Sequence, residues 1–240
     1  MATQSSNDGV ARRDFLKRVG VAAAGIAMSR AAVAADPGAP PPKPQNVIGP
    51  DAALERLMQG NARYVEGVAK RHDFKAEREA LAGGQNPFAA ILSCADSRIA
   101  PEYAFDSARG DLFVVRVAGN FANDDIIASL EFGVAVLNVP LIMVLGHGSC
   151  GAVDATIKSV QGGPPLPGHL PSLVAALTPA VKAVAGKPGN MLENATKENV
   201  VLNVQTLMNA MPILKKAVDD KKLRVVGGVY NLATGKVDVV

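Results

Sequence analysis

The chain has 240 residues, of which 48% are hydrophobic and 4% aromatic, and it contains no Trp. This is ordinary globular composition, and the core must be built of Val, Leu, Ile and Ala. The formal net charge of +3 arises in residues 1–34, which hold five basic and two acidic residues, so the remainder is neutral. A neutral domain argues against nucleic acid or a membrane surface as the partner.

Residues 1–34 have the pattern of a bacterial export signal. Arg12 and Arg13 lie in a charged segment, an apolar run of small residues covers 19–29, and residues 32–34 resemble a cleavage site. Paired arginines followed by Phe-Leu-Lys resemble the twin-arginine signal. A membrane anchor is the alternative, but a spanning helix needs roughly 20 apolar residues. We expect a periplasmic or secreted protein, with the leader cleaved or retained.

Residues 35–50 are rich in Pro and predict an extended linker. The folded domain is therefore expected to cover 51–240, with no internal repeat. Its hydrophobic pattern predicts alternating helices and strands. The helices are expected at 51–67, 124–139, 151–160, 171–185 and 191–209, and the strands at 88–93, 112–117, 141–145, 223–230 and 236–240.

This alternation implies an α/β fold, with a mostly parallel central sheet flanked by helices and preceded by an N-terminal helical arm. In such sheets the ligand site lies at the carboxyl ends of the strands. Cys94 and Cys150, the only cysteines, each follow an apolar strand, and His147 is three residues before Cys150. Two thiolates and an imidazole suit zinc, and three protein ligands leave a fourth position open for chemistry.

Two other interpretations of these residues stay open on spacing alone. An exported protein with two cysteines could form a disulfide instead. Residues 146–151 also match the G-x-G-x-x-G pattern of a dinucleotide site, but no acidic residue follows at the distance that a ribose contact requires. The remaining histidines, His72 and His169, lie in polar or Pro-rich stretches and are expected at the surface rather than on a metal.

The segments 94–98 (CADSR) and 147–151 (HGSCG) together resemble the two signatures of β-class carbonic anhydrases. Further segments continue the resemblance in order across 51–240: 110–116, 118–120, 129–132, 198–200 and 229–230. The family implies zinc on Cys94, His147 and Cys150, and the reversible hydration of carbon dioxide to bicarbonate and a proton by zinc-bound hydroxide. It also implies a homodimer or homotetramer whose N-terminal helix packs on the partner.

Four further residues match functional positions of that family. Asp96 is expected to accept a hydrogen bond from the zinc-bound group, and Arg98 to keep Asp96 ionised and off the metal. If that pair breaks, Asp96 could ligate zinc and close the site. The less favoured alternative is that Asp96 and Arg98 form only a structural salt bridge. Gln85 and the Gly151 backbone N–H are expected to bind substrate, although Gln85 could simply be a turn residue before Pro87.

Some members of the family carry an inhibitory bicarbonate site built from Trp, Arg and Tyr. Arg116 and Tyr230 match two of these positions, but Ile91 stands where the Trp would be, so we expect no such regulation. The prediction is thus a constitutively open zinc lyase. Three alternatives remain: a hydrolase acting on a molecule such as carbon disulfide, a zinc-storage protein without catalysis, and a disulfide-stapled binding module.

Overall fold

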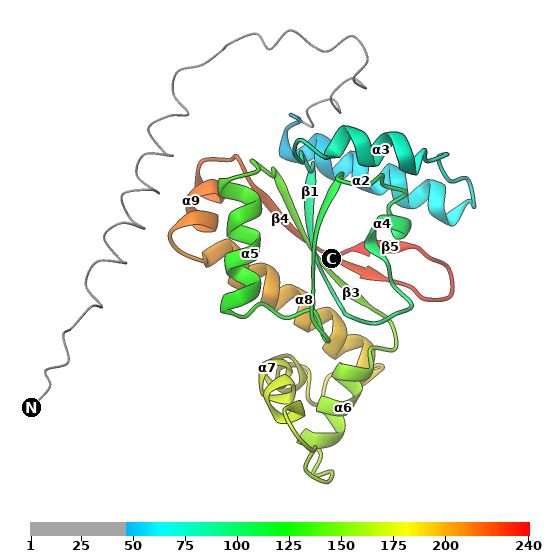
Figure 1. Ribbon diagram of the computed structural model, residues 1–240. Helices are drawn as coiled ribbons and strands as arrows, with labels where there is room; N and C mark the ends of the chain where they lie inside the picture. The colour runs from blue at the N-terminus through cyan, green and yellow to red at the C-terminus, as the bar shows by residue number, and fades with distance from the viewer. Residues whose placement is uncertain (1–46) are drawn as a thin grey trace, which may run out of the picture. The chain divides into compact units, whose positions relative to one another are not determined.

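Five strands form one central sheet in the computed structural model, which describes residues 47–240 (Figure 1). Their order across the sheet is β2-β1-β3-β4-β5, and all neighbours are parallel except β4 and β5. The strands are β1 (Ala89–Ser93), β2 (Leu112–Arg116), β3 (Leu141–His147), β4 (Arg224–Tyr230) and β5 (Val237–Val239). The predicted α/β fold is confirmed, whereas the expected export signal and most of the linker lie outside the described residues.

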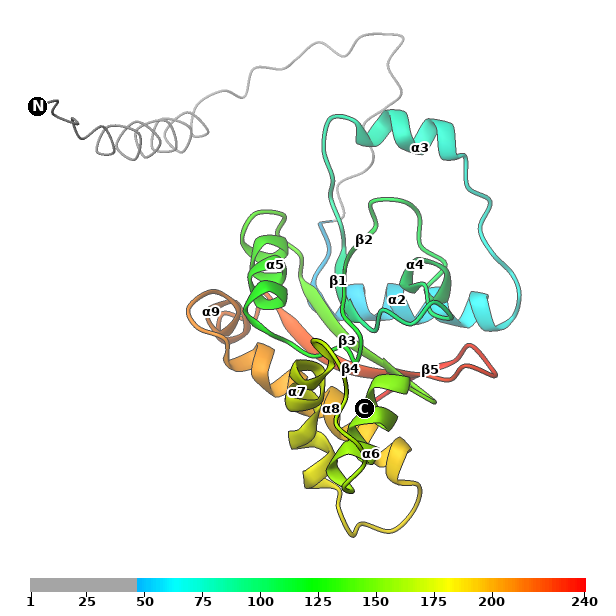
Figure 2. The ribbon, with the colours of Figure 1, turned by 60° about the horizontal axis from the view of Figure 1, so that its bottom comes forward.

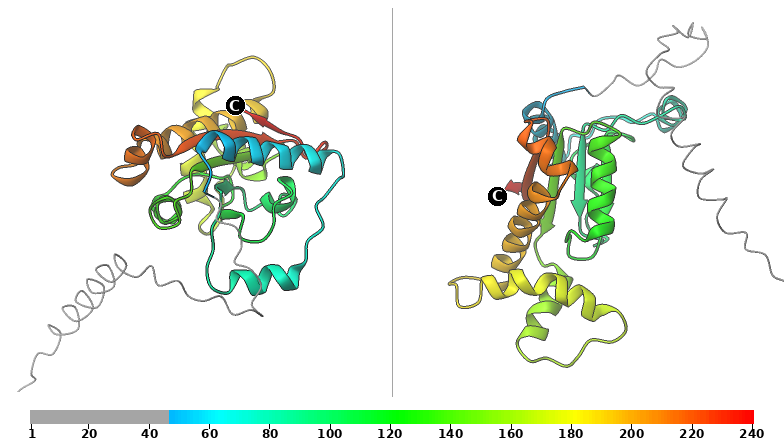
Figure 3. Two further views of the ribbon diagram at one scale, coloured as in Figure 1. Left: turned by 90° about the horizontal axis from the view of Figure 1, so that it is seen from above. Right: turned by 90° about the vertical axis from the view of Figure 1, so that its left-hand side faces the viewer.

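Helices cover both faces of the sheet (Figures 1 and 3). One apolar cluster joins α2 and α4 to β1 and β3, and a second cluster joins α5, α8 and α9 to the opposite face. Beyond the carboxyl ends of β1 and β3, α6 and α7 enclose a third cluster (Figure 2). The helices are α2 (Pro50–Val65), α3 (Phe74–Leu81), α4 (Pro101–Ala104), α5 (Asp124–Ala135), α6 (Gly151–Val160), α7 (Leu170–Ala183), α8 (Met191–Asn209) and α9 (Ile213–Asp219).

Two glycines allow α8 to pack closely on the sheet. Gly146 in β3 and Gly227 in β4 both face Val200 of α8, and a Cβ atom on either glycine would lie 2.6 Å from a methyl carbon of Val200. Such a distance is too short for two carbon atoms, so a larger residue would push the helix outward. The first glycine of the 146–151 pattern therefore serves helix packing in this fold.

Three helices were not expected from the sequence, namely α3, α4 and α9. Asp73 is the N-cap residue of α3, and its carboxylate accepts hydrogen bonds from two backbone N–H groups of the first turn at 3.1 and 3.0 Å. It contributes no buried residue and lies apart from the sheet (Figure 2). Within residues 47–240, we find no helix with the length and apolar character needed to span a membrane.

The predicted helix at 124–139 is too long, because α5 ends at Ala135. Asn138 has a φ of +55°, a left-handed conformation that ends a helix, and Pro140 then disfavours helical geometry in the residue before it. The apolar residues that continue the pattern belong instead to the connection into β3. Of these residues Val136 is 56% exposed and Val139 is buried, so an apolar run at this place does not require a helix.

Candidate metal centre

The three predicted metal ligands are brought together at one edge of the sheet. Cys94 follows the last residue of β1, His147 is the last residue of β3, and Cys150 is the N-cap residue of α6. Because β1 and β3 are parallel neighbours, their carboxyl ends meet. The turn between His147 and Cys150 contains Ser149 at a φ of +52°, which reverses the chain and returns Cys150 to the histidine.

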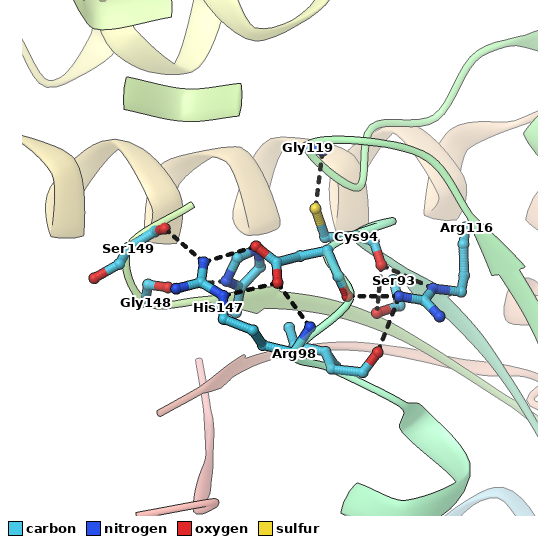
Figure 4. A network of polar contacts seen from close by, with 10 residues as sticks. Ser93, Cys94, Arg98, Arg116, Gly119, His147, Gly148 and Ser149 are labelled. Carbon is cyan, nitrogen blue, oxygen red and sulfur yellow. Dashed lines mark hydrogen bonds and ion pairs between the residues drawn. The ribbon is translucent and has the colours of Figure 1, made fainter. Parts of the chain in front are cut away.

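The geometry and burial of these residues suit a metal ion. One ligand atom from each of Cys94, His147 and Cys150 lies within 4.8 Å of the other two, and the three residues are at most 3% exposed. Both cysteines are free, so the disulfide interpretation is wrong for this structure. His147 Nδ1 lies 2.8 Å from the Gly148 carbonyl oxygen and must donate to it (Figure 4).

That hydrogen bond determines the state of the other ring nitrogen. With the proton on Nδ1, His147 Nε2 carries a lone pair, and it is buried without a hydrogen-bond partner among the described residues. A buried polar atom without a partner costs free energy, and a metal ion would remove that cost. Two sulfurs and one imidazole nitrogen are a donor set that zinc prefers. The residues present therefore fit zinc.

The two cysteines have opposite pKa shifts, because the hydrogen bond between them favours the thiolate on Cys94 and the thiol on Cys150. The hydrogen bond from the Cys150 thiol lowers the pKa of Cys94 to about 4 against the effect of burial, and the hydrogen bond from the Gly119 N–H acts in the same direction. The Gly119 N–H donates to Cys94 Sγ at 3.2 Å. The hydrogen bond to Cys94, together with burial, raises the pKa of Cys150. Cys94 is thus held as a thiolate, the form that binds metal.

Asp96 and Arg98 form a two-pronged ion pair beside the cluster. Arg98 Nε and Nη2 donate to the two Asp96 carboxylate oxygens at 2.9 and 2.7 Å, and the Arg98 backbone N–H adds a third bond at 2.9 Å. The Arg98 side chain thereby holds the pKa of Asp96 well below its usual range. Asp96 Oδ2 still lies 3.8 Å from His147 Nε2, so the carboxylate borders the metal position.

Arg116 shapes the loop that carries Cys94 and Asp96. Its Nε donates to the Cys94 carbonyl at 2.9 Å, and its Nη2 donates to the carbonyls of Asp96 and Ile99 at 2.8 and 2.9 Å (Figure 4). The Tyr230 hydroxyl lies 3.1 Å from that of Tyr64. Burial, followed by that contact, raises the pKa of Tyr230 to about 12. Both side chains therefore have hydrogen-bond partners within the described part of the chain.

The two predicted substrate-binding residues differ in position. Gly151 is the first residue of α6, directly after Cys150, and no heavy atom lies within 4 Å of the place where its Cβ would be. Gln85 is exposed and precedes β1, whereas Cys94 follows β1. Since a strand rises ~3.3 Å per residue, the five residues of β1 place Gln85 and Cys94 at opposite ends of the sheet. One chain therefore does not bring Gln85 to its own metal centre.

The other histidines are not part of a metal cluster in the described part of the chain. His72 Nδ1 lies 2.9 Å from a carboxylate oxygen of Glu77, and His169 precedes the first turn of α7. The sequence did not indicate the contacts of Gly119 or of Asn199, which donates to the Gly119 carbonyl. The segments that contain them were noted only for the family resemblance, and no spacing rule connects residues 80 positions apart.

The fold and site define an α/β metalloprotein with a Cys₂His centre at the carboxyl edge of a parallel sheet. A sequence profile described as "Carbonic anhydrase" matches residues 89–237. The relatives include carbonic anhydrase 2 of Mycobacterium tuberculosis, with 37% identity over 78% of this chain and 91% of the relative. The carbonic anhydrase of Mycolicibacterium smegmatis has 36% identity over 79% and 93%.

The solved structures point to the same family. A Coccomyxa β-carbonic anhydrase in complex with acetazolamide has a TM-score of 0.59 and 29% identity, over 78% of this chain and 86% of that chain. The β-carbonic anhydrase CcaA has a TM-score of 0.59 and 27% identity, over 78% and 94%. This chain belongs to the β-class carbonic anhydrase family, whose members use zinc.

Proposed function

We propose that this chain catalyses the zinc-dependent, reversible hydration of carbon dioxide to bicarbonate and a proton, as a lyase. One observation carries the proposal: Cys94, His147 and Cys150 converge in a buried site, with the imidazole Nε2 free to bind a metal. Relatives at 36–37% identity that are named carbonic anhydrase support it. Bound zinc would lower the pKa of a coordinated water and so supply a nucleophile near neutral pH.

The chain's own residues would orient the reactants. Cys94, His147 and Cys150 would hold the zinc and leave its fourth position open. Asp96 borders that position and would accept a hydrogen bond from the attacking group, while Arg98 directs the carboxylate away from the metal. The open arrangement of the site is therefore favoured over the one in which Asp96 is a ligand. The Gly151 N–H, at the N-terminus of α6, would donate to a substrate oxygen.

A homo-oligomer would bring Gln85 to a metal centre, because a second copy can place it where its own chain cannot. Two features support a second copy. Helix α3 has no buried residue. A cavity of about 560 Å³ next to it is lined by both charged and aromatic side chains, and of the latter Phe74 is 64% and Tyr103 73% exposed. A tetrameric β-carbonic anhydrase of Sordaria macrospora has this fold, at 23% identity and a TM-score of 0.63.

The oligomer is tested by light scattering coupled to size exclusion. Phe74→Asp places a charge on the exposed apolar surface and should shift the chain towards the monomer. An unchanged mass would place the interface elsewhere. Lys158→Glu, on the exposed side of α6, is the matched control and should leave the mass unchanged.

The function is tested by zinc content and carbon dioxide hydration of the full-length chain and of Cys150→Ser. One zinc per chain, with zinc and activity lost in the variant, supports the proposal. Wild-type protein that binds zinc and is inactive at every pH would favour zinc storage. Activity with carbon disulfide in place of carbon dioxide would reassign the substrate, and oxidised cysteines in metal-free protein would restore the disulfide-stapled module.

We also propose export to the periplasm by the twin-arginine route, on the sequence of residues 1–34 alone. That route carries folded proteins, so zinc could be bound before transport and would protect both cysteines from oxidation. Replacing Arg12 and Arg13 by Lys should retain the protein in the cytoplasm, as cell fractionation would show. Unchanged export of this double variant would contradict the proposed route.

A further inference from the structure

Two buried asparagines of α8 hold the loop of residues 117–122. Asn199 and Asn203 are 2% and 8% exposed. Asn199 Nδ2 donates to the Gly119 carbonyl oxygen at 2.8 Å, and Asn203 Oδ1 accepts a hydrogen bond from the Ala122 N–H at 2.7 Å. The loop is therefore attached to the helix at two points, although it follows β2 and is 80 positions away in the sequence.

The two asparagines also hold each other. Asn203 Nδ2 donates to the backbone carbonyl of Asn199 at 2.7 Å and to its side-chain Oδ1 at 3.0 Å. Each amide oxygen and each amide nitrogen of the pair thus has a partner. The Ala122 N–H and the Gly119 carbonyl define which end of each amide is the donor. Asn199 is consequently held with its Nδ2 facing Gly119.

Gly119 connects this pair to the metal centre. Its N–H donates to Cys94 Sγ at 3.2 Å, while its carbonyl accepts from Asn199. Gly119 has a φ of +85°, which is outside the range that other L-residues adopt readily. The two peptide groups that flank Gly119 therefore each have a partner, Cys94 for the N–H and Asn199 for the carbonyl.

We propose that Asn199 and Asn203 are positioning residues for the metal: through Gly119 they hold the Cys94 sulfur where a metal ion needs it. The proposal rests on the zinc site of the proposed function. Apolar residues could fill the same helix face without removing two amides from water, which costs free energy. Contacts outside the ligand set are known to orient ligands, and their loss typically lowers metal affinity about 10–100-fold.

The variant Asn199→Asp separates positioning from packing. Aspartate keeps the volume and the acceptor for Asn203 but has no N–H to donate to Gly119. Asn199→Leu removes both. The matched control is Thr196→Val, on the same helix: Thr196 is 3% exposed, and its Oγ1 has no hydrogen-bond partner among the described residues. This control removes a buried polar atom without changing the contact with the loop.

Three measurements are made on the full-length chain. Zinc affinity is obtained by competition with a chromogenic chelator. The cobalt(II) derivative reports sulfur coordination through its thiolate-to-metal absorption. Urea unfolding of the metal-free protein reports stability. We expect Asn199→Asp and Asn199→Leu to bind zinc about 10–100-fold more weakly and to alter the cobalt spectrum. Thr196→Val should match the wild type in both metal measurements.

A loss of zinc affinity below threefold in both Asn199 variants would overturn the proposal. An equal loss in Thr196→Val would also overturn it, because the effect would then follow from any change in α8. If the Asn199 variants do not fold, Asn203→Leu decides by the same threshold, since it removes the support of Asn199 and the contact with Ala122. Failure of the wild type to bind zinc would instead refute the proposed function.

Discussion

Gly119→Ala tests whether the loop beside Cys94 is as tightly constrained as the contacts indicate. A Cβ atom on Gly119 would lie 2.8 Å from Leu177 Cδ1 and 3.1 Å from Cδ2, in a buried position of α7. The left-handed conformation costs alanine about 1–2 kcal/mol, and overpacking costs about 1–3 kcal/mol more. We therefore expect the free energy of unfolding to fall by about 2–5 kcal/mol.

The control is Gly162→Ala, which has nearly the same conformation in open space. Its φ is +88°, and no heavy atom lies within 4 Å of the place of its Cβ, so only the conformational cost of about 1–2 kcal/mol applies. Both variants change the unfolded chain in the same way, so this contribution cancels in the comparison. Urea unfolding in the presence of a chelator removes the contribution of bound metal. Equal losses in the two variants would refute the argument from Leu177.

Three further outcomes are expected. Asn61→Leu leaves three buried backbone groups without the partners that Asn61 supplies at 2.8–2.9 Å, and should lower the free energy of unfolding by about 3–5 kcal/mol in urea. Burial acts to raise the pKa of Asp106, but the hydrogen bonds from Arg63 and from the Lys70 N–H together lower it. Stability present above about pH 4 should therefore be lost as the pH falls, less steeply in Arg63→Met. Arg98→Met frees Asp96 from two hydrogen bonds and should lower kcat/KM for carbon dioxide at unchanged zinc content.

Two of these outcomes have a control on an exposed group. Gln59→Ala changes an exposed residue of the helix that carries Asn61, and should cost less than about 0.5 kcal/mol. Lys158→Met breaks an exposed ion pair of 2.6 Å and should leave kcat/KM unchanged. A loss in Lys158→Met as large as that in Arg98→Met, or a pH profile that Arg63→Met does not flatten, would contradict the assigned contacts.

The metal ligands could be predicted from the sequence because their positions relative to strands and turns are visible locally. Cys94 and Cys150 each follow an apolar strand, and parallel neighbouring strands bring their carboxyl ends together whatever the details of packing. His147 needs only a short turn to meet Cys150. The strand positions and the parallel sheet could be predicted for the same reason. A run of apolar residues can be recognised in the sequence without knowing which strands and helices pack against it.

Other features depend on contacts between distant segments and left no local signal. Helix α3 has no apolar face buried in the chain, so hydrophobic periodicity could not reveal it. Gln85 matches a family position because it lies nine residues before Cys94 in the sequence. Those nine residues include the whole of β1, so the two residues lie at opposite ends of the strand within one chain. Distance along the sequence thus brought the three metal ligands together correctly but did not bring Gln85 to the same site.

The two buried asparagines of α8 indicate a functional role that helix propensity alone does not reveal. Asparagine is a poor helix former, and burying its amide costs free energy unless every polar atom is paired. A helix that only had to cover the sheet would place apolar residues at these positions, as it does at Val200 and Leu207. Asn199 and Asn203 instead contact the loop whose N–H meets Cys94. Burying the amides of Asn199 and Asn203 costs free energy, and this cost is best explained by their role in holding the Cys94 sulfur in position.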